Sequence, residues 1–322
     1  MSVLKLIAPC KDYIWGGNKL REEYGKKLDS DRIAESWELS CHRDGQSVID
    51  GGEFGGKMLS EFIEANGKTA VLGTNCDRFE SFPILIKLID AKDNLSVQVH
   101  PSDEYALKAD GEYSKTEMWY IADCDEGAEI IYGFKHEISK EEFARRIAEN
   151  TLLDVVNRVP VHKGDVFFIE SGTLHAIGKG ILIAEIQQNS NTTYRVYDYG
   201  RVGSDGKPRE LHVEKALDVT ERIPQKCSSS AQGQPEKVGG GVRTLLRSCE
   251  YFNVNKLEID GTMTLSADEK SFKSLLLLDG KAEIKDADGV RTAVKGDSFF
   301  VTAGSGDFSV TGKCEAILSD IV

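Results

Sequence analysis

Residues 96–101, Ser-Val-Gln-Val-His-Pro, place three polar side chains at alternate positions. Because successive side chains of a β-strand point to opposite faces, Ser96, Gln98 and His100 would all point the same way. A single histidine in such a strand is usually an ordinary core residue with a hydrogen-bond partner. A metal site would need further ligands that face the same interior.

Lys115 and Glu117 form a second pair of polar residues two positions apart, and the apolar run 118–121 follows them. We expect both side chains to share one face of a neighbouring strand. Two strands that turn Gln, His, Lys and Glu toward one interior bury charge, which is costly unless a metal ion or a ligand compensates it. The pattern therefore predicts a binding site in place of an ordinary core.

A repeated unit supplies a second histidine. Residues 163–175 and 295–307 share a lysine, Gly-Asp, Phe-Phe and a later glycine at identical offsets, which indicates one turn-strand-turn unit used twice. Both copies resemble the second motif of the cupins, although neither has the usual proline. The last position is His175 in the first copy and Asp307 in the second. We therefore expect a metal ligand at His175 and no metal site in the second copy.

Gln98, His100, Glu117 and His175 together offer one amide, two imidazoles and one carboxylate. Two histidines and a carboxylate on β-strands suit a divalent metal ion with open coordination positions. On their own, these three would be compatible with zinc or with the facial triad of non-haem iron oxygenases.

The composition describes a soluble globular protein of 322 residues, 29% charged and 40% hydrophobic. The length allows two domains, and we expect neither a membrane-spanning segment nor a signal peptide. The seven cysteines are scattered and no pair has CxxC spacing, so we expect reduced thiols and a cytoplasmic protein. A net charge of −13 argues against nucleic acid and membranes as partners. An anionic substrate would then need a local basic cluster.

Most of the chain has the pattern of short strands and turns, and the clearest helical segment covers about 138–158, where Ser139 begins a capping box. Residues 224–241 have the Ser, Gly and Pro content of a linker. We predict a mainly β protein with two cupin-type, jelly-roll β-barrel domains. Residues 1–223 would form the catalytic, metal-binding domain with the small helical insertion. Residues 242–322 would form a metal-free, cupin-like β domain.

Several motifs together resemble the class I mannose-6-phosphate isomerases, or phosphomannose isomerases, in their short bacterial form. The resemblance extends from Tyr13-Ile-Trp15-Gly to the last strands and covers essentially the whole chain. The Gln-x-His-Pro motif at 98–101 and the Glu…Asn-Ser…Arg pattern at 185–195 are specific to that family. Further matching segments are 83–90, 115–119 and 172–176.

The resemblance implies a zinc-dependent aldose–ketose isomerase that interconverts mannose 6-phosphate and fructose 6-phosphate through an enediolate. It implies one zinc ion per chain, held by Gln98, His100, Glu117 and His175. The residues that it implies in catalysis are Lys115, Glu185 and Arg195. The residues that it implies in substrate contacts are Lys87, Ser96 and Arg201 toward the phosphate, and Trp15 and Glu35 at the rim. Arg201 stands where many members of the family have lysine.

The catalytic base is left open between Glu185 and Lys115. Glu185 should lie mid-strand beside Ile181 and Ile183, a setting that we expect to raise its pKa toward the working pH. Alternatively, it could form an ion pair with Arg195. Lys115 would lie near the metal, where it could act as a base with a lowered pKa or stay charged and stabilise the enediolate oxygen. We favour Glu185 as the base.

Two other functions fit part of the pattern. An iron-dependent cupin oxygenase would use His100, Glu117 and His175, but it would have no use for Gln98 or for an anion pocket. A sugar-phosphate-binding cupin without catalysis would keep most of the same residues, so only an assay separates it from the isomerase.

Overall fold

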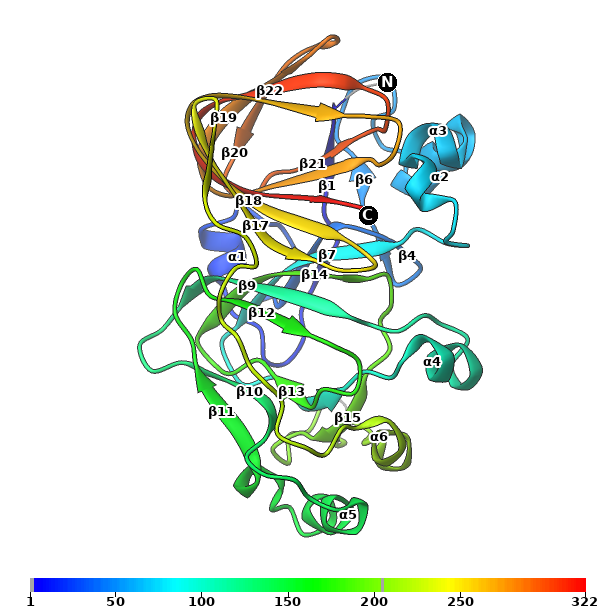
Figure 1. Cartoon of the computed structure of the whole chain (residues 1–322), viewed down its shortest axis with the longest axis vertical. Helices are drawn as coiled ribbons and strands as arrows, with labels where there is room; N and C mark the ends of the chain where they lie inside the picture. Colours follow the sequence, from blue (N-terminus) through cyan, green and yellow to red (C-terminus); the bar gives the residue numbers. More distant parts are fainter. Residues whose placement is uncertain (1–2, 204–205) are drawn as a thin grey trace.

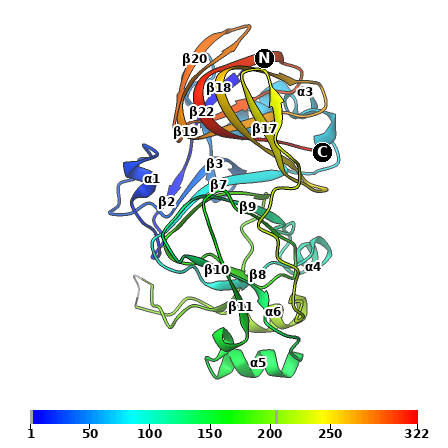
Figure 2. The same ribbon diagram turned by 60° about the vertical axis from the view of Figure 1, so that its left-hand side comes forward.

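The structure is a computed structural model that describes residues 3–203 and 206–322. It is mainly β, as predicted, and its described strands form three large sheets and one two-stranded sheet. Figures 1 and 2 show the large sheets stacked along the longest axis of the molecule. The sheet formed largely by C-terminal strands lies at one end, and helices α5 (Lys140–Ala148) and α6 (Val213–Val219) lie at the other.

The middle sheet has six strands, which in spatial order are β12 (Val166–Ile169), β9 (Glu117–Cys124), β14 (Ile181–Gln188), β7 (Ile84–Ala91), β3 (Glu35–Leu39) and β2 (Cys10–Lys11). Its two central strands, β7 and β14, are buried at all eight positions. Both faces of this sheet are therefore covered, which is why these strands are almost continuously apolar. The exceptions, such as Lys87 and Glu185, face the five-stranded sheet.

The five-stranded sheet covers one face of the middle sheet. Its strands, in spatial order, are β11 (Val156–Pro160), β10 (Glu129–Phe134), β13 (His175–Ala176), β8 (Val97–Val99) and β15 (Tyr194–Tyr197). A two-stranded sheet is formed by β4 (Cys41–His42) and β5 (Gly45–Gln46). The predicted candidate site lies between the middle and five-stranded sheets.

The nine-stranded sheet covers the other face of the middle sheet. Its main path is β16 (Glu236–Val238), β17 (Gly241–Ser248), β18 (Asn253–Ala267), β22 (Gly306–Asp320), β19 (Lys273–Asp286), β21 (Ser298–Val301), β1 (Val3–Ile7) and β6 (Val48–Ile49). Strand β20 (Gly289–Val294) pairs with β19 beside this path. The repeated units place Phe-Phe on β12 in one sheet and on β21 in the other.

Two features of the structure bear on the predicted division of the chain at residue 223. Strand β1 pairs with β21, with Val3 opposite Val301, so the N-terminus belongs to the same sheet as the C-terminal strands. The predicted linker 224–241 already contains β16, which pairs with β17 in a hairpin through a glycine turn. The predicted division at 223 therefore marks where the path of the chain changes, but it does not separate the sheets.

The helices are α1 (Lys19–Glu22), α2 (Leu59–Asn66), α3 (Lys68–Leu72), α4 (Asp103–Ala109), α5 (Lys140–Ala148) and α6 (Val213–Val219), with short 3-10 turns at Thr74–Cys76 and Leu152–Asp154. Helix α5 has its predicted start, because the Ser139 hydroxyl accepts a hydrogen bond from the backbone N–H of Glu142. It is shorter than the predicted 138–158. Asn150 has a φ of 60°, a left-handed conformation in which a helix cannot continue.

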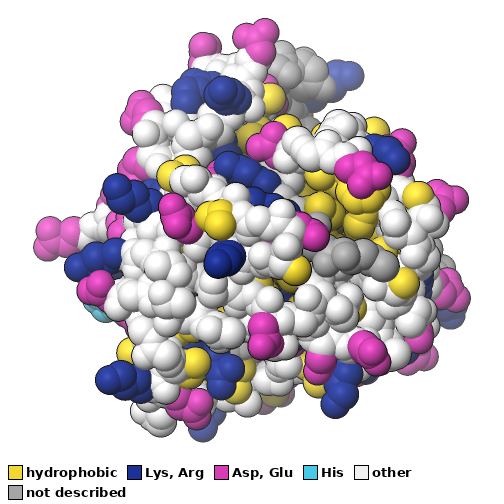
Figure 3. Space-filling view, turned by 90° about the horizontal axis from the view of Figure 1, so that it is seen from above, with side chains coloured by type: hydrophobic (Ala, Val, Ile, Leu, Met, Phe, Trp, Pro, Cys, Tyr) yellow, Lys and Arg dark blue, Asp and Glu magenta, His cyan; other side chains and the backbone are white. Residues whose placement is uncertain are grey.

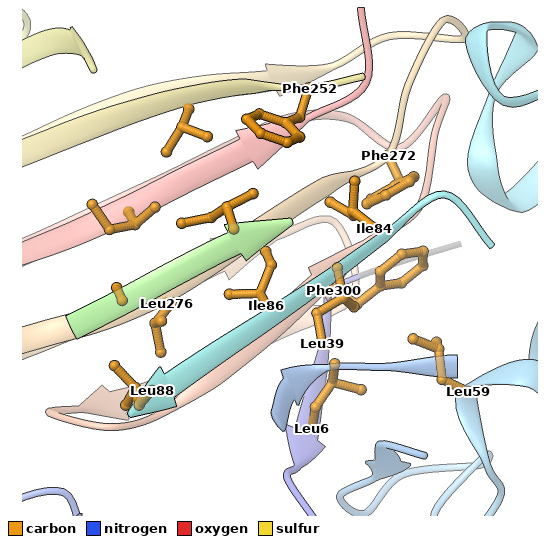
Figure 4. Packing of buried hydrophobic residues seen from close by; sticks show 14 of the residues in the cluster. Leu6, Leu39, Leu59, Ile84, Ile86, Leu88, Phe252, Phe272, Leu276 and Phe300 are labelled. Atoms are coloured by element: carbon orange, nitrogen blue, oxygen red, sulfur yellow. The ribbon is translucent and has the colours of Figure 1, made fainter. Parts of the chain in front are cut away.

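The middle and nine-stranded sheets share one apolar core (Figure 4). Ile84, Ile86 and Leu88 of β7 pack there with Phe272 and Phe300 from the C-terminal half. The rings of Phe272 and Phe300 lie 5.1 Å apart and are fully buried. This shared core fixes the middle sheet from behind, so that its other face can carry polar residues.

Candidate active site

A row of four side chains crosses the middle sheet in register. Lys87 on β7 lies opposite Glu185 on β14. On the neighbouring strands, Trp37 of β3 lies opposite Lys87, and Trp119 of β9 lies opposite Glu185. The indole N–H of Trp119 donates to Glu185 Oε2 at 3.0 Å. Lys87 Nζ lies 5.0 Å from the centre of the Trp37 ring and 3.6 Å from Glu185 Oε1. Two tryptophans therefore flank a buried lysine–glutamate pair.

A second row crosses the five-stranded sheet and faces the first. Gln98 on β8 lies opposite His175 on β13 and opposite Arg195 on β15. The alternation predicted for residues 96–101 is consistent with this arrangement, although regular strand geometry ends at Val99, just before His100.

The residues predicted as metal ligands converge between the two rows. His175 Nε2 lies 3.3 Å from Glu117 Oε1, and His100 Nε2 lies 3.7 Å from Glu117 Oε2. One candidate ligand atom from each of these residues lies within 4.8 Å of the other two. Gln98 is adjacent, with its amide nitrogen 3.3 Å from His175 Nε2. Its amide would have to turn over to present its oxygen to a metal.

The hydrogen bonds around these residues fit a metal ion. The Nδ1 atoms of His100 and His175 lie 3.0 and 2.9 Å from the carbonyl oxygens of Thr192 and Thr173. If each Nδ1 carries the proton and donates it to that carbonyl, each Nε2 keeps a free lone pair for a metal. Glu117 is fully buried, and among the described residues neither of its carboxylate oxygens accepts a well-oriented hydrogen bond. A buried carboxylate between two free imidazole nitrogens, with no well-oriented hydrogen bond to either oxygen, is a donor set that a divalent cation would satisfy.

Lys115 precedes β9 and reaches into the same cluster. Its Nζ lies 2.7 Å from Glu117 Oε2, 3.4 Å from His100 Nε2 and 3.7 Å from Glu185 Oε1. Glu35, on the rim, pairs with Lys87 at 3.4 Å. The cluster is thus a closed set of alternating charges, all of them nearly inaccessible to solvent.

The pKa expected for Glu185 is wrong in direction, and the pKa of Lys115 favours the charged form among the two roles left open for it. Burial acts to raise the pKa of Glu185, but the positive charges of Lys115 and Lys87 and the hydrogen bond from Trp119 outweigh it and lower that pKa. Burial acts to lower the pKa of Lys115, but Glu117 and Glu185 outweigh it and raise that pKa. Burial, together with the charge of Glu185, raises the pKa of Glu117 to about 8. A dication at this position would hold Glu117 ionised.

Arg195 does not pair with Glu185. Its Nε donates to the Ser96 hydroxyl at 3.2 Å, and its Nη1 donates to the carbonyl of Glu210 at 3.0 Å. The partners of Glu185 are instead Lys87 and Lys115.

A cavity of about 450 Å³ opens onto this cluster. Eight of the predicted site residues line it, namely Trp15, Glu35, Lys87, Ser96, Gln98, Lys115, Glu185 and Arg195. Basic side chains of Arg195, Arg209 and Lys215 line the cavity, together with His212. This is a local basic cluster of the kind that an anionic ligand would require in an acidic protein.

Arg201 is not among the residues that line this cavity. Its guanidinium pairs with Asp198 at 2.6 Å and donates to the carbonyl of Asn94. Arg209, which was not predicted as a site residue from the sequence, pairs with the same Asp198 and does line the cavity. Both arginines lie in an irregular loop after β15, where no strand periodicity indicates which side chain turns inward.

Two segments of the chain match models of known families. Residues 3–138 match the model described as the phosphomannose isomerase type I catalytic domain. Residues 242–321 match the model described as the mannose-6-phosphate isomerase cupin domain.

Similarity to known proteins extends along nearly the whole chain. The mannose-6-phosphate isomerase ManA of Bacillus subtilis is 40% identical over 97% of this chain and 96% of its own. The chain belongs to the type I phosphomannose isomerases. The mannose-6-phosphate isomerase of Streptococcus mutans is 42% identical over 78% of this chain and 77% of its own. The predicted family and the cupin type of fold are confirmed.

The structural comparison agrees. The crystal structure of the mannose 6-phosphate isomerase from Bacillus subtilis superimposes with a TM-score of 0.91 at 37% identity, and the match covers 99% of both chains. Within residues 3–203 and 206–322, no helix is long and apolar enough to cross a membrane. Figure 3 shows lysines and arginines interspersed with acidic residues on the face seen from above, not gathered into one basic field.

We expect His175→Ala to lose the bound metal, because it removes one of two imidazoles from a closed donor set. Metal content per chain, measured by elemental analysis after dialysis, should fall from about one equivalent to near zero. The matched control is Asp307→Ala, at the equivalent position of the second repeated unit, where the side chain is exposed.

Asp307→Ala should leave the metal content unchanged. A second equivalent of metal in the wild-type protein that disappears in Asp307→Ala would contradict the assignment of metal binding to the first unit. Full retention of metal in His175→Ala would contradict it as well.

Proposed function

We propose that this chain interconverts mannose 6-phosphate and fructose 6-phosphate with the help of one zinc ion. The observation that supports the proposal most strongly is the convergence of His100, Glu117 and His175 beside a buried lysine–glutamate pair that lines a cavity with a basic wall. The relatives named above, which are known as mannose-6-phosphate isomerases, supply the reaction class.

His100, Glu117 and His175 would hold the metal, with Gln98 as a fourth ligand after its amide turns over. Zinc bound there would act as a Lewis acid that stabilises negative charge on the oxygens of the sugar. Thr192 and Thr173 keep the two imidazoles in the tautomer that binds a metal, because their carbonyls accept the Nδ1 protons.

Glu185 is our candidate for the base that moves the proton between C1 and C2. Trp119 fixes one carboxylate oxygen, whereas Oε1 accepts no well-oriented hydrogen bond from the described residues. Oε1, which lies 3.6 Å from Lys87 Nζ and 3.7 Å from Lys115 Nζ, is the oxygen left to take a proton from a sugar bound in the cavity that Glu185 lines. Aldose–ketose isomerisation needs one such carboxylate because the same group can return the proton to the neighbouring carbon.

Lys115 is better suited to an electrostatic role. Its ammonium group lies between the carboxylates of Glu117 and Glu185 and close to His100. A fixed positive charge in this position would stabilise the developing negative charge of an enediolate without any reorganisation. A second ammonium group, that of Lys87, pairs with Glu35 and with Glu185.

The phosphate would bind at the basic wall of the cavity. Arg195, Arg209 and Lys215 offer charge-assisted hydrogen bonds there, and the Ser96 hydroxyl is held next to Arg195. The sequence-based assignment placed Arg201 in this role, but its position outside the cavity lining favours Arg209. Binding at this end would position C1 and C2 of the sugar over Glu185.

We expect Glu185→Gln to stop proton transfer while leaving the metal and the substrate in place. The substitution keeps the shape of the side chain but removes the base, so exchange of the C2 hydrogen of mannose 6-phosphate with deuterium oxide should slow by about 10² to 10⁴. The exchange can be followed by proton NMR, and metal content should stay at the wild-type level. Lys115→Met, measured in parallel, separates the two candidates. Wild-type exchange in Glu185→Gln together with none in Lys115→Met would make the lysine the base.

We expect Arg209→Ala to raise KM for mannose 6-phosphate about tenfold or more with little change in kcat, because one charge-assisted contact with the phosphate is lost. Arg201→Ala serves as the control, since it also removes a partner of Asp198 but no lining residue. Its KM should change less than that of Arg209→Ala. The reverse order of the two KM values would restore Arg201 as the phosphate ligand.

A further inference from the structure

Residues 114–116, which carry Lys115, have no regular secondary structure. We refer to them as the lysine segment. Although they lie outside the sheets, the three residues are buried. Strand β9 begins only at Glu117, and beyond it one backbone hydrogen bond, from the N–H of Gln188 to the carbonyl of Thr116 at 3.1 Å, continues the pairing with β14. Because an ammonium group placed within 4 Å of three partners needs a fixed backbone, we expect further contacts to hold the residues around Lys115.

Side chains provide further hydrogen bonds to the backbone of the lysine segment. The Asp103 carboxylate accepts the backbone N–H of Ser114 at 2.7 Å. The Gln188 side chain accepts the backbone N–H of Thr116 at 3.0 Å. The residues on both sides of Lys115 are therefore anchored, one by helix α4 and the other by the end of β14.

Asp103 also ties these anchors together. Its carboxylate accepts the amide N–H of Gln188 at 3.2 Å and the hydroxyl of Tyr251 at 2.9 Å. Three donors thus converge on one group that, when ionised, can only accept hydrogen bonds. Tyr251 lies between β17 and β18, in the C-terminal half of the chain.

We propose that Asp103, held by Tyr251, is a positioning residue for Lys115, and that the C-terminal half acts on the reaction through this contact. The inference rests on the proposed function for its kinetic part only. Asp103 and Tyr251 are not among the residues that line the active-site cavity. Neither would therefore touch the substrate, and their effect must pass through the lysine segment.

Tyr251→Phe tests the contact with the smallest change, since it removes one hydroxyl and keeps the ring. Asp103→Asn keeps the size of the side chain but turns an amide NH₂ toward at least one donor. The matched control is Tyr105→Phe, which removes a hydroxyl on the same helix that bonds instead to the exposed Asp218. All three proteins should fold, and their thermal midpoints identify any general loss of stability.

Two readouts are expected to change together. Hydrogen exchange measured by mass spectrometry should become at least about fivefold faster in a peptide covering residues 110–118 of Tyr251→Phe and Asp103→Asn, and should stay unchanged in residues 273–286. For mannose 6-phosphate, kcat should fall about tenfold while KM stays within about twofold. Tyr105→Phe should match the wild type in both readouts.

Wild-type hydrogen exchange at 110–118 in both variants would overturn the proposal. Faster exchange with an unchanged kcat in an active enzyme would also overturn it, because the contact would then support structure alone. If the wild-type protein has no isomerase activity, the proposed function fails. The exchange measurement would still decide whether Tyr251 and Asp103 hold the segment.

Discussion

The burial of charge between the middle and five-stranded sheets is the constraint on which the rest of the structure depends. Three carboxylates, from Glu35, Glu117 and Glu185, lie there with the two ammonium groups of Lys87 and Lys115, all nearly inaccessible to water. When all five are ionised, three negative and two positive charges leave one negative charge without a partner. Such a cluster is stable only if a cation joins it or a carboxyl stays protonated. The neutral histidines beside Glu117 make a divalent metal the natural complement.

This cluster depends on sheets that cannot shift. Apolar residues of β7 and β14 pack against the nine-stranded sheet in the shared core (Figure 4). This packing fixes the two strands, so the polar residues on their opposite faces stay paired across the sheet. The C-terminal half carries no group of three metal-binding side chains within its described residues. It shares the apolar core behind the middle sheet, and the hydroxyl of Tyr251 donates a hydrogen bond to Asp103.

The sequence predicts the parts of the site that obey strand periodicity. Gln98 and His175, for example, lie directly opposite each other on adjacent strands, as alternation and the repeated motif suggest. Features that depend on contacts between distant segments were not predicted. Pairing of Val3 with Val301 has no local signal, and in the loop after β15 nothing in the sequence distinguishes Arg209 from Arg201. The pKa direction of Glu185 was wrong because apolar neighbours in the sequence indicate burial but not the opposite charges from other strands.

The most direct test of this account is the metal dependence of isomerase activity in the purified protein. Conversion of mannose 6-phosphate to fructose 6-phosphate would be followed in a coupled assay before chelation, after chelation and after addition of zinc or of iron(II). Activity should disappear with the metal and return with about one equivalent of zinc per chain. Full activity in protein shown to be metal-free would contradict the proposed role of the metal. So would the absence of isomerisation combined with oxygen consumption in the presence of iron(II).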